Sequence, residues 1–174
     1  MGLKQDIRDS SDYIKFRKIV QQVQKRLNPE KDKEEAVALH AGRTSRKLFG
    51  ERKYSGKHLI DASLNDLSVR SRLVELRVRT SNQIDILHEA SKAMKHSMLT
   101  NFQDDIKKRF STVGDRNAFM ETMIASALEI EREGDALLKI FDSLINDIDK
   151  SSYHLKGVIE CLAMLDSSKG GKVI

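Results

Sequence analysis

The residues best suited to chemistry lie in one basic segment between residues 43 and 57. The segment contains six cations and two aromatic rings: Arg43, Arg46, Lys47, Arg52, Lys53 and Lys57, with Phe49 and Tyr54. Arginine and lysine attract phosphates whatever the base sequence, and an aromatic ring can stack on an unpaired base. Two glycines in the segment favour a loop. We expect this loop to bind nucleic acid. The competing interpretation is a solvated basic linker whose two rings anchor it to a helical bundle.

A second set of cations lies further along the chain, at Arg70, Arg72, Arg77 and Arg79. On a helix, positions 70 and 77 share a face, and so do positions 72 and 79. Such a stripe could follow a phosphate backbone, and we therefore add Arg70 and Arg72 to the predicted nucleic-acid site. For Arg77 and Arg79, ion pairs with acidic residues of a neighbouring helix are the favoured interpretation.

Catalytic and metal-binding patterns are missing from the sequence. The five histidines are scattered, without the spacing of a di-iron or zinc site, and the chain has no Walker-type phosphate loop and no nucleophile elbow. The single Cys161 has no intrachain partner, which indicates a reducing compartment. The sequence thus predicts a protein without enzymatic activity, catalytic residues, metal or cofactor.

The helices that would position these residues follow from hydrophobic spacing. Inward-type residues alternate three and four positions apart from Met120 to Leu165, as coiled-coil packing requires. A seam of this length needs an antiparallel neighbour in the same chain, a second subunit, or both. We expect oligomerisation through seven of its residues: Leu137, Phe141, Leu144, Ile148, Leu155, Val158 and Leu162. Gly134, on the same seam, is expected to permit a close crossing or a bend.

Other elements precede this helix. We expect one helix over residues 11 to 27, capped by Ser10 or Ser11, and a second from 30 to 41 that ends at Gly42. A long helical stripe follows within residues 57 to 110, with a register change near residues 80 to 83, and a turn with a cap at 111 to 115. A turn near residue 113 would set two groups of charges opposite each other: Arg77 and Arg79 against Asp147 and Asp149, and Lys92 and Lys95 against Glu131 and Glu133.

The predicted fold class is all-α: an elongated helical hairpin or coiled-coil bundle with a short, helical, basic N-terminal region, forming homo-oligomers. We divide the chain into a basic N-terminal region (1–57), a long antiparallel hairpin for oligomerisation (58–165) and a flexible tail (166–174).

Charge is unevenly distributed along the 174 residues. Residues 1–57 carry 15 Lys plus Arg against 8 Asp plus Glu, and residues 112–174 carry 7 against 11, within a net charge of +5. A basic N-terminal region suggests a polyanion as partner. The start of the chain lacks the apolar core of a signal peptide, and no stretch is long and apolar enough for a membrane span. We expect a cytoplasmic protein that does not bind membranes, in the host cytoplasm if a phage encodes it.

The stretch from Leu138 to Met164 resembles the C-terminal helix of the UvsY-type recombination mediators of T-even-like phages. The resemblance rests on Phe141-Asp142-Ser143-Leu144-Ile145, Ile148, Ser151-Ser152-Tyr153, Leu155-Lys156 and Ile159-Glu160. That family usually has an arginine where Ser151 stands. The resemblance implies a ring-forming helical protein that binds single-stranded DNA, remodels the single-strand-binding protein and loads a RecA-like recombinase.

Two other classes of protein fit the same pattern. A phage small terminase subunit also combines a helical hairpin, a ring and basic DNA-binding regions. A structural coiled-coil adaptor would explain every apolar stripe and leave the basic loop without a role.

Overall fold

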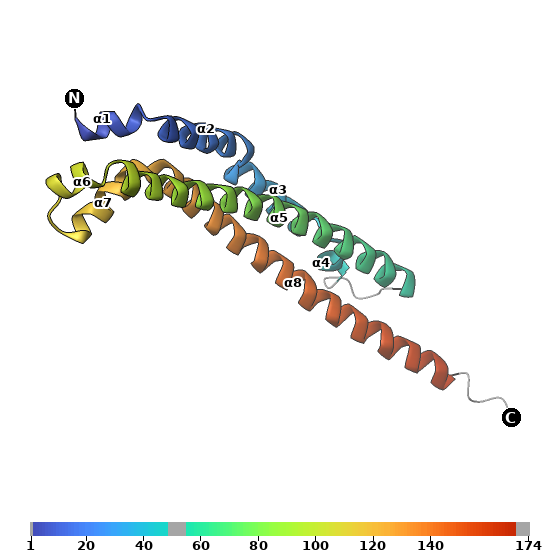
Figure 1. Cartoon of the computed structure of the whole chain (residues 1–174). Coiled ribbons are helices and arrows are strands. Elements are labelled where there is room, and N and C mark those ends of the chain that lie inside the picture. The colour runs from blue at the N-terminus through green and yellow to red at the C-terminus, as the bar shows by residue number, and fades with distance from the viewer. Residues whose placement is uncertain (1, 49–54, 170–174) are drawn as a thin grey trace. The chain divides into compact units, whose positions relative to one another are not determined.

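A computed structural model describes residues 2–48 and 55–169, and all regular elements in these residues are α-helices (Figure 1). They are α1 (Leu3–Arg8), α2 (Ser11–Arg26), α3 (Pro29–Ala41), α4 (Thr44–Leu48), α5 (Gly56–Asn101), α6 (Gln103–Arg109), α7 (Val113–Met123) and α8 (Ala125–Lys169). The long helices α5 and α8 pack together as a hairpin. The predicted all-α hairpin fold is therefore confirmed.

Two compact units divide the described residues. The first takes the described residues within 2–29 and 79–138, and the second takes those within 30–78 and 139–169. Both α5 and α8 therefore contribute one part to each unit. The first 57 residues, which we expected to form a region of their own, are shared: α1 and α2 belong to the first unit, and α3 and α4 to the second.

The core of the first unit is built from six helices. Apolar residues of α1, α2, the second part of α5, α6, α7 and the start of α8 form one buried cluster, which includes Ile7, Phe16, Leu87, Met98 and Ile124. Ser10 caps α2, since its Oγ accepts a hydrogen bond from the N–H of Tyr13 at 3.2 Å. The predicted helices at 11–27 and 30–41 are thus confirmed as α2 and α3. Helix α2 is stabilised by its apolar face, which is buried in this core.

The second unit has a smaller core between α4, α5 and α8. Leu48, Leu59, Ala62 and Leu155 are buried together there, with Val158 packed against them.

The coiled-coil seam of α8 is used mainly inside the chain. Leu137, Phe141, Ile148 and Leu155 are buried, Leu144 and Val158 are half-buried, and Leu162 is exposed. Our prediction that the first four form an interface between subunits is wrong, because α5, with 46 residues, is as long as the 45-residue α8 and covers the seam.

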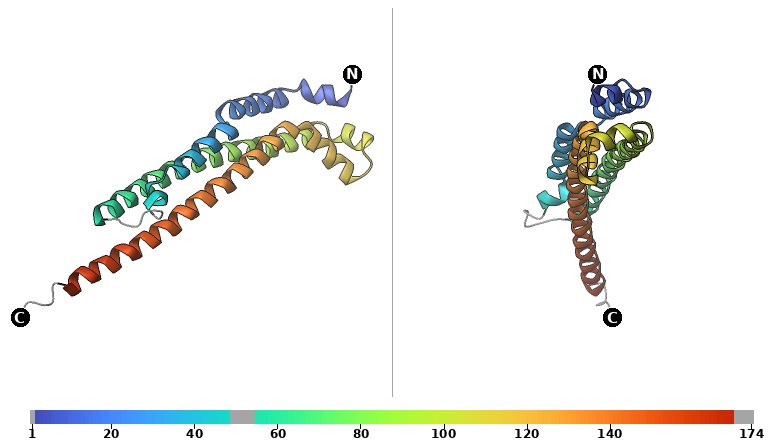
Figure 2. Two further views of the ribbon diagram at one scale, coloured as in Figure 1. Left: turned by 180° about the vertical axis from the view of Figure 1, so that it is seen from behind. Right: turned by 60° about the vertical axis from the view of Figure 1, so that its left-hand side comes forward.

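Helix breaks differ from the predicted ones. Helix α5 runs unbroken through residues 80–83, and it passes from the second unit to the first at Val78 and Arg79, close to the expected change of register. The helix ends before Phe102, whose φ of −127° and ψ of 17° leave the helix. The seam helix is interrupted at Ile124, which separates α7 from α8. Ile124 is fully buried, so the break turns α7 to add its apolar residues to the core of the first unit. In Figures 1 and 2, α6 and α7 connect α5 with α8 at this end of the first unit.

The connection also sets the register of the hairpin. The cap expected within residues 111–115 is Thr112, whose Oγ1 accepts a hydrogen bond from the N–H of Asp115 at 3.1 Å. However, Arg77 pairs with Asp142, not with Asp147 or Asp149. The predicted pairing of Arg77 is wrong because α6 and α7, not a tight turn, join the two long helices.

The second predicted group of charge pairs is wrong as well. Lys92 pairs with Glu89 of its own helix at 3.0 Å. Glu131 accepts a hydrogen bond from Ser91 at 3.2 Å.

Candidate nucleic-acid interface

The first cation of the predicted basic loop, Arg43, is buried. Only 1% of the residue is exposed, and its Nε and Nη2 donate to the two carboxylate oxygens of Asp66 on α5, at 3.0 and 2.8 Å. Nη2 also contacts Ser45 Oγ at 3.2 Å, and this hydroxyl donates to Asp66 at 2.7 Å. The fork of the guanidinium thus matches one carboxylate in the bidentate geometry that makes such pairs strong.

His40 and Asp147 extend this network to α3 and α8. Arg43 Nη1 donates to Asp147 Oδ2 at 3.2 Å, and His40 Nε2 lies 2.7 Å from the same oxygen. Burial raises the pKa of Asp147, but the hydrogen bond and charge of His40 and the charges of Arg43 and Arg46 outweigh it and lower that pKa below 3.8. The prediction that Arg43 binds phosphate is wrong, because its donors are used inside the second unit.

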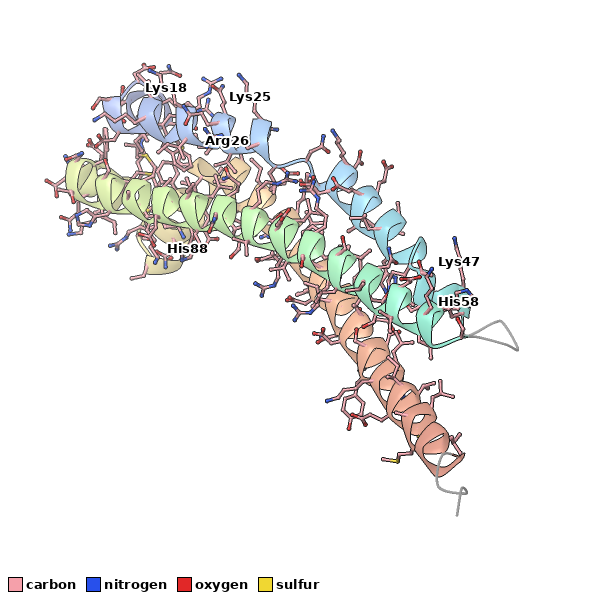
Figure 3. The ribbon with its side chains drawn as sticks, turned by 90° about the vertical axis from the view of Figure 1, so that its right-hand side faces the viewer. Lys18, Lys25, Arg26, Lys47, His58 and His88 are labelled. Carbon is pink, nitrogen blue, oxygen red and sulfur yellow. The ribbon has the colours of Figure 1, made fainter. Side chains whose placement is uncertain are left out.

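The remaining residues of the predicted loop fall into two groups. Phe49, Arg52, Lys53 and Tyr54 lie outside the described residues. Arg46 and Lys47 are exposed on α4, so this part of the segment is a short helix and not a loop, and Lys57 is exposed in the first turn of α5. Figure 3 shows Lys47 and His58 at the same end of the second unit. Arg46, Lys47 and Lys57 remain candidates for phosphate binding.

Arg70 and Arg72 connect helices within the second unit. Arg70 pairs with Asp149 of α8 at 2.6 Å, and Arg72 pairs with Glu35 of α3 at 2.7 Å and with Glu75 at 3.1 Å. Hydrogen bonds to these carboxylates, followed by their charges, raise the pKa of both arginines. Exposed pairs of this kind contribute about 0 to 1 kcal/mol. The predicted stripe is therefore not a row of free cations.

A different basic surface lies on α2, in the first unit. Residues 15–26 contain five cations and no acidic residue: Lys15, Arg17, Lys18, Lys25 and Arg26. All five are exposed, and in the described part of the chain none of them forms an ion pair. Figure 3 shows Lys18 and Lys25 on the side of α2 away from α5. This surface was not among the predicted sites, although the run of five cations without an acidic residue is visible in the sequence.

The amphipathic spacing of α2 explains its position. Phe16, Val20 and Val23 are buried, which leaves the opposite side of the helix to the cations. Lys15, Lys18 and Lys25 share one side, at intervals of three and seven residues, and span about 15 Å along the axis. A short row of positive charge is therefore held on a rigid, packed helix.

A groove of about 470 Å³ lies beside this row, between α2 and α5 of the first unit. Phe16, Ile19, Ala93 and Met94 give the groove an apolar wall. Lys15 contributes a cation to the lining and Asp12 an anion, and the other polar lining residues come from the last turns of α5. An apolar groove next to cations is the kind of surface that can accept an unstacked base beside its phosphate.

No protein family, curated protein or solved structure matches this chain. Within the described residues, no cluster of three or more His, Cys, Asp or Glu is arranged to hold a metal ion. None of the helices described is both long and apolar enough to traverse a lipid bilayer.

Proposed function

We propose that this protein binds single-stranded DNA through the outer face of α2, as a non-catalytic accessory protein of the recombination-mediator type. The observation that supports this proposal is the row of exposed cations from Lys15 to Arg26, none of which has an acidic partner in the described residues. Each phosphate that a lysine neutralises releases condensed counterions, which is the main source of sequence-independent affinity.

The groove between α2 and α5 favours single strands over duplex. Bases of a duplex are stacked and paired, whereas a single strand can turn a base toward an apolar surface. Ala93 is an exposed part of the groove lining, so a larger side chain at this position would occupy the space. The proposal also includes a RecA-like recombinase and a single-strand-binding protein as partners.

To test this proposal, binding of a labelled single-stranded oligonucleotide is measured by fluorescence anisotropy at several salt concentrations. We expect the triple variant Lys15→Gln/Lys18→Gln/Lys25→Gln to lose about tenfold or more in affinity. Its slope of log K against log salt should be smaller by about 2, because three phosphate contacts contribute about 0.7 each for single strands.

The matched control is Lys33→Gln/Lys139→Gln/Lys150→Gln, which removes the same charge from exposed positions elsewhere. Equal binding by the two triple variants would contradict the assignment to α2. Ala93→Phe should weaken binding of single strands but not of duplex. If the wild-type protein prefers duplex, the terminase interpretation replaces the mediator, and if it binds neither, the structural adaptor does.

A further inference from the structure

An apolar stripe on α5 faces away from the core of the second unit. It follows the three-four spacing of a coiled coil and consists of Ile60, Leu64, Leu67, Ser71, Val74 and Val78. Ile60 is 55% exposed, Leu64 61% and Leu67 59%. Val74 is half-buried, and Ser71 is the one polar residue of the stripe. Solvent-facing positions of a helix are normally polar, so a row of exposed apolar residues indicates a surface that binds another molecule.

This stripe is distinct from the stripe that α5 buries. The buried stripe runs through Leu59, Ala62, Val69, Leu73 and Leu76, and at 100° per residue the two stripes point roughly 150° apart. Helix α5 of the second unit therefore carries two coiled-coil patterns, and the chain's own core covers only one.

Neighbouring helices of the second unit leave the outer stripe open. On one flank, Arg70 and Arg77 pair with Asp149 and Asp142 of α8. On the other flank, Arg72 pairs with Glu35 of α3. Helices α3 and α8 thus lie on either side of the stripe.

We infer that a second copy of this chain covers the stripe, with the two α5 helices side by side and parallel. The charges on the two flanks of the stripe favour a second copy of the chain as the partner and a parallel orientation of the two helices. One flank of the stripe carries Arg70 and Arg77, and the other carries Asp61 and Glu75. In a parallel pair, a residue on the first flank faces the residue five positions later on the partner's second flank, which sets Arg70 opposite Glu75. An antiparallel pair would bring arginine against arginine.

The intrachain ion pairs do not prevent this arrangement. Arg70 and Glu75 are both partly exposed, and a guanidinium can donate to two carboxylates. Ser71 adds a small polar residue to the middle of the stripe, and one polar seam residue can fix the register of a coiled coil. The stripe is about 27 Å long, so we expect an interface at the small end of the range and dissociation at micromolar concentrations.

The first experiment is sedimentation velocity of the full-length protein over a range of concentrations. We expect the wild-type protein to dimerise and Leu64→Glu/Leu67→Glu to sediment as a monomer with unchanged helicity, because both positions are exposed in the single chain. The control Val37→Glu/Val113→Glu changes two other exposed apolar residues and should dimerise like the wild type. A monomeric wild type, or a Leu64→Glu/Leu67→Glu variant that still dimerises, would overturn the inference.

The second experiment tests the direction of the helices. In a Cys161→Ser background, Val78→Cys should form a disulfide-linked dimer on mild oxidation, because parallel helices bring the two copies of position 78 together. Cross-linking of Ile60→Cys to Val78→Cys in a mixture, without a Val78 homodimer, would show antiparallel helices and overturn the inference. The DNA site proposed above lies on α2, so loss of dimerisation and loss of DNA binding can be distinguished.

Discussion

At the scale of single residues, an arginine in a basic segment can either form a buried ion pair or lie exposed at the surface. Arg43 and Arg46 are separated by three positions, yet the first is buried against Asp66 and the second is exposed. Arg43 donates to the buried carboxylate of Asp66 on α5, whereas Arg46 points to the surface of α4. Charge count alone could not distinguish the two residues.

Removal of Arg43 should therefore destabilise the protein strongly. Arg43→Met would leave the fully buried Asp66 without its counter-charge, at a cost of about 3 to 5 kcal/mol in the free energy of unfolding. Urea unfolding followed by circular dichroism measures this cost. Arg72→Met, which breaks only exposed pairs, should cost about 0 to 1 kcal/mol. Arg43→Met/Asp66→Leu should recover most of the loss. An equal cost for the two single variants would contradict the buried network.

Asp147 should make stability depend on pH in the acidic range. Its folded-state pKa lies below 3.8, so the unfolded chain takes up this proton at a higher pH than the folded chain does. The stability that ionised Asp147 contributes is present above about pH 4 and is lost as the pH falls through the folded-state pKa. In urea titrations, Asp147→Asn should thus be destabilised relative to the wild type near neutral pH, and the difference should shrink as the pH falls and Asp147 of the wild type becomes protonated. A similar pH-dependent difference for the exposed Asp85→Asn would contradict this assignment.

At the scale of elements, close approach of α5 and α8 depends on Gly134. A Cβ atom at this position would lie 2.7 Å from Cδ1 and 2.8 Å from Cγ1 of Ile84, closer than such atoms can approach. The predicted close crossing is confirmed at this point of the first unit. The helix accepts a residue of low helix propensity because packing of the two long helices requires it.

Gly134→Ala should consequently destabilise the protein, although alanine favours helix by about 1 kcal/mol. We expect a loss of about 1 to 3 kcal/mol from overpacking. The loss should disappear when Gly134→Ala is made in an Ile84→Ala background. Gly157→Ala is the matched control on α8, since no heavy atom lies within 4 Å of its Cβ position, and it should be neutral or stabilising. Thermal unfolding of the four variants gives the comparison, and stabilisation by Gly134→Ala alone would show that α5 and α8 are further apart.

At the scale of the whole molecule, one hairpin supplies the cores of both units. Helices α5 and α8 run through both, so the seam that we assigned to oligomerisation is largely occupied within the chain. The proposed dimer therefore uses a different surface, the outer stripe of α5.

Core and assembly residues should respond differently to mutation. Ile148→Ala should lower the free energy of unfolding by about 2 to 5 kcal/mol, because Ile148 is fully buried in the chain. The folded variant should keep the association state of the wild type in sedimentation velocity. Leu162→Ala, at a seam position that is 37% exposed, should cost less than about 1.5 kcal/mol. If Ile148→Ala dissociates without any loss of stability, the seam of α8 forms the interface between subunits instead.

The sequence by itself determined the helical class, the seam of α8, the capped turn within residues 111–115 and the order of the two long helices. These features depend on local spacing and on capping residues, which act within a few positions along the chain. Only the tertiary structure decided the hairpin register, the burial of Arg43 and the freedom of the α2 cations. Each of these depends on which residues from distant parts of the chain meet. Spacing alone cannot distinguish an arginine that pairs with an aspartate 23 residues away from a free cation. Nor can it distinguish a seam covered by a helix of the same chain from one that is open to another subunit.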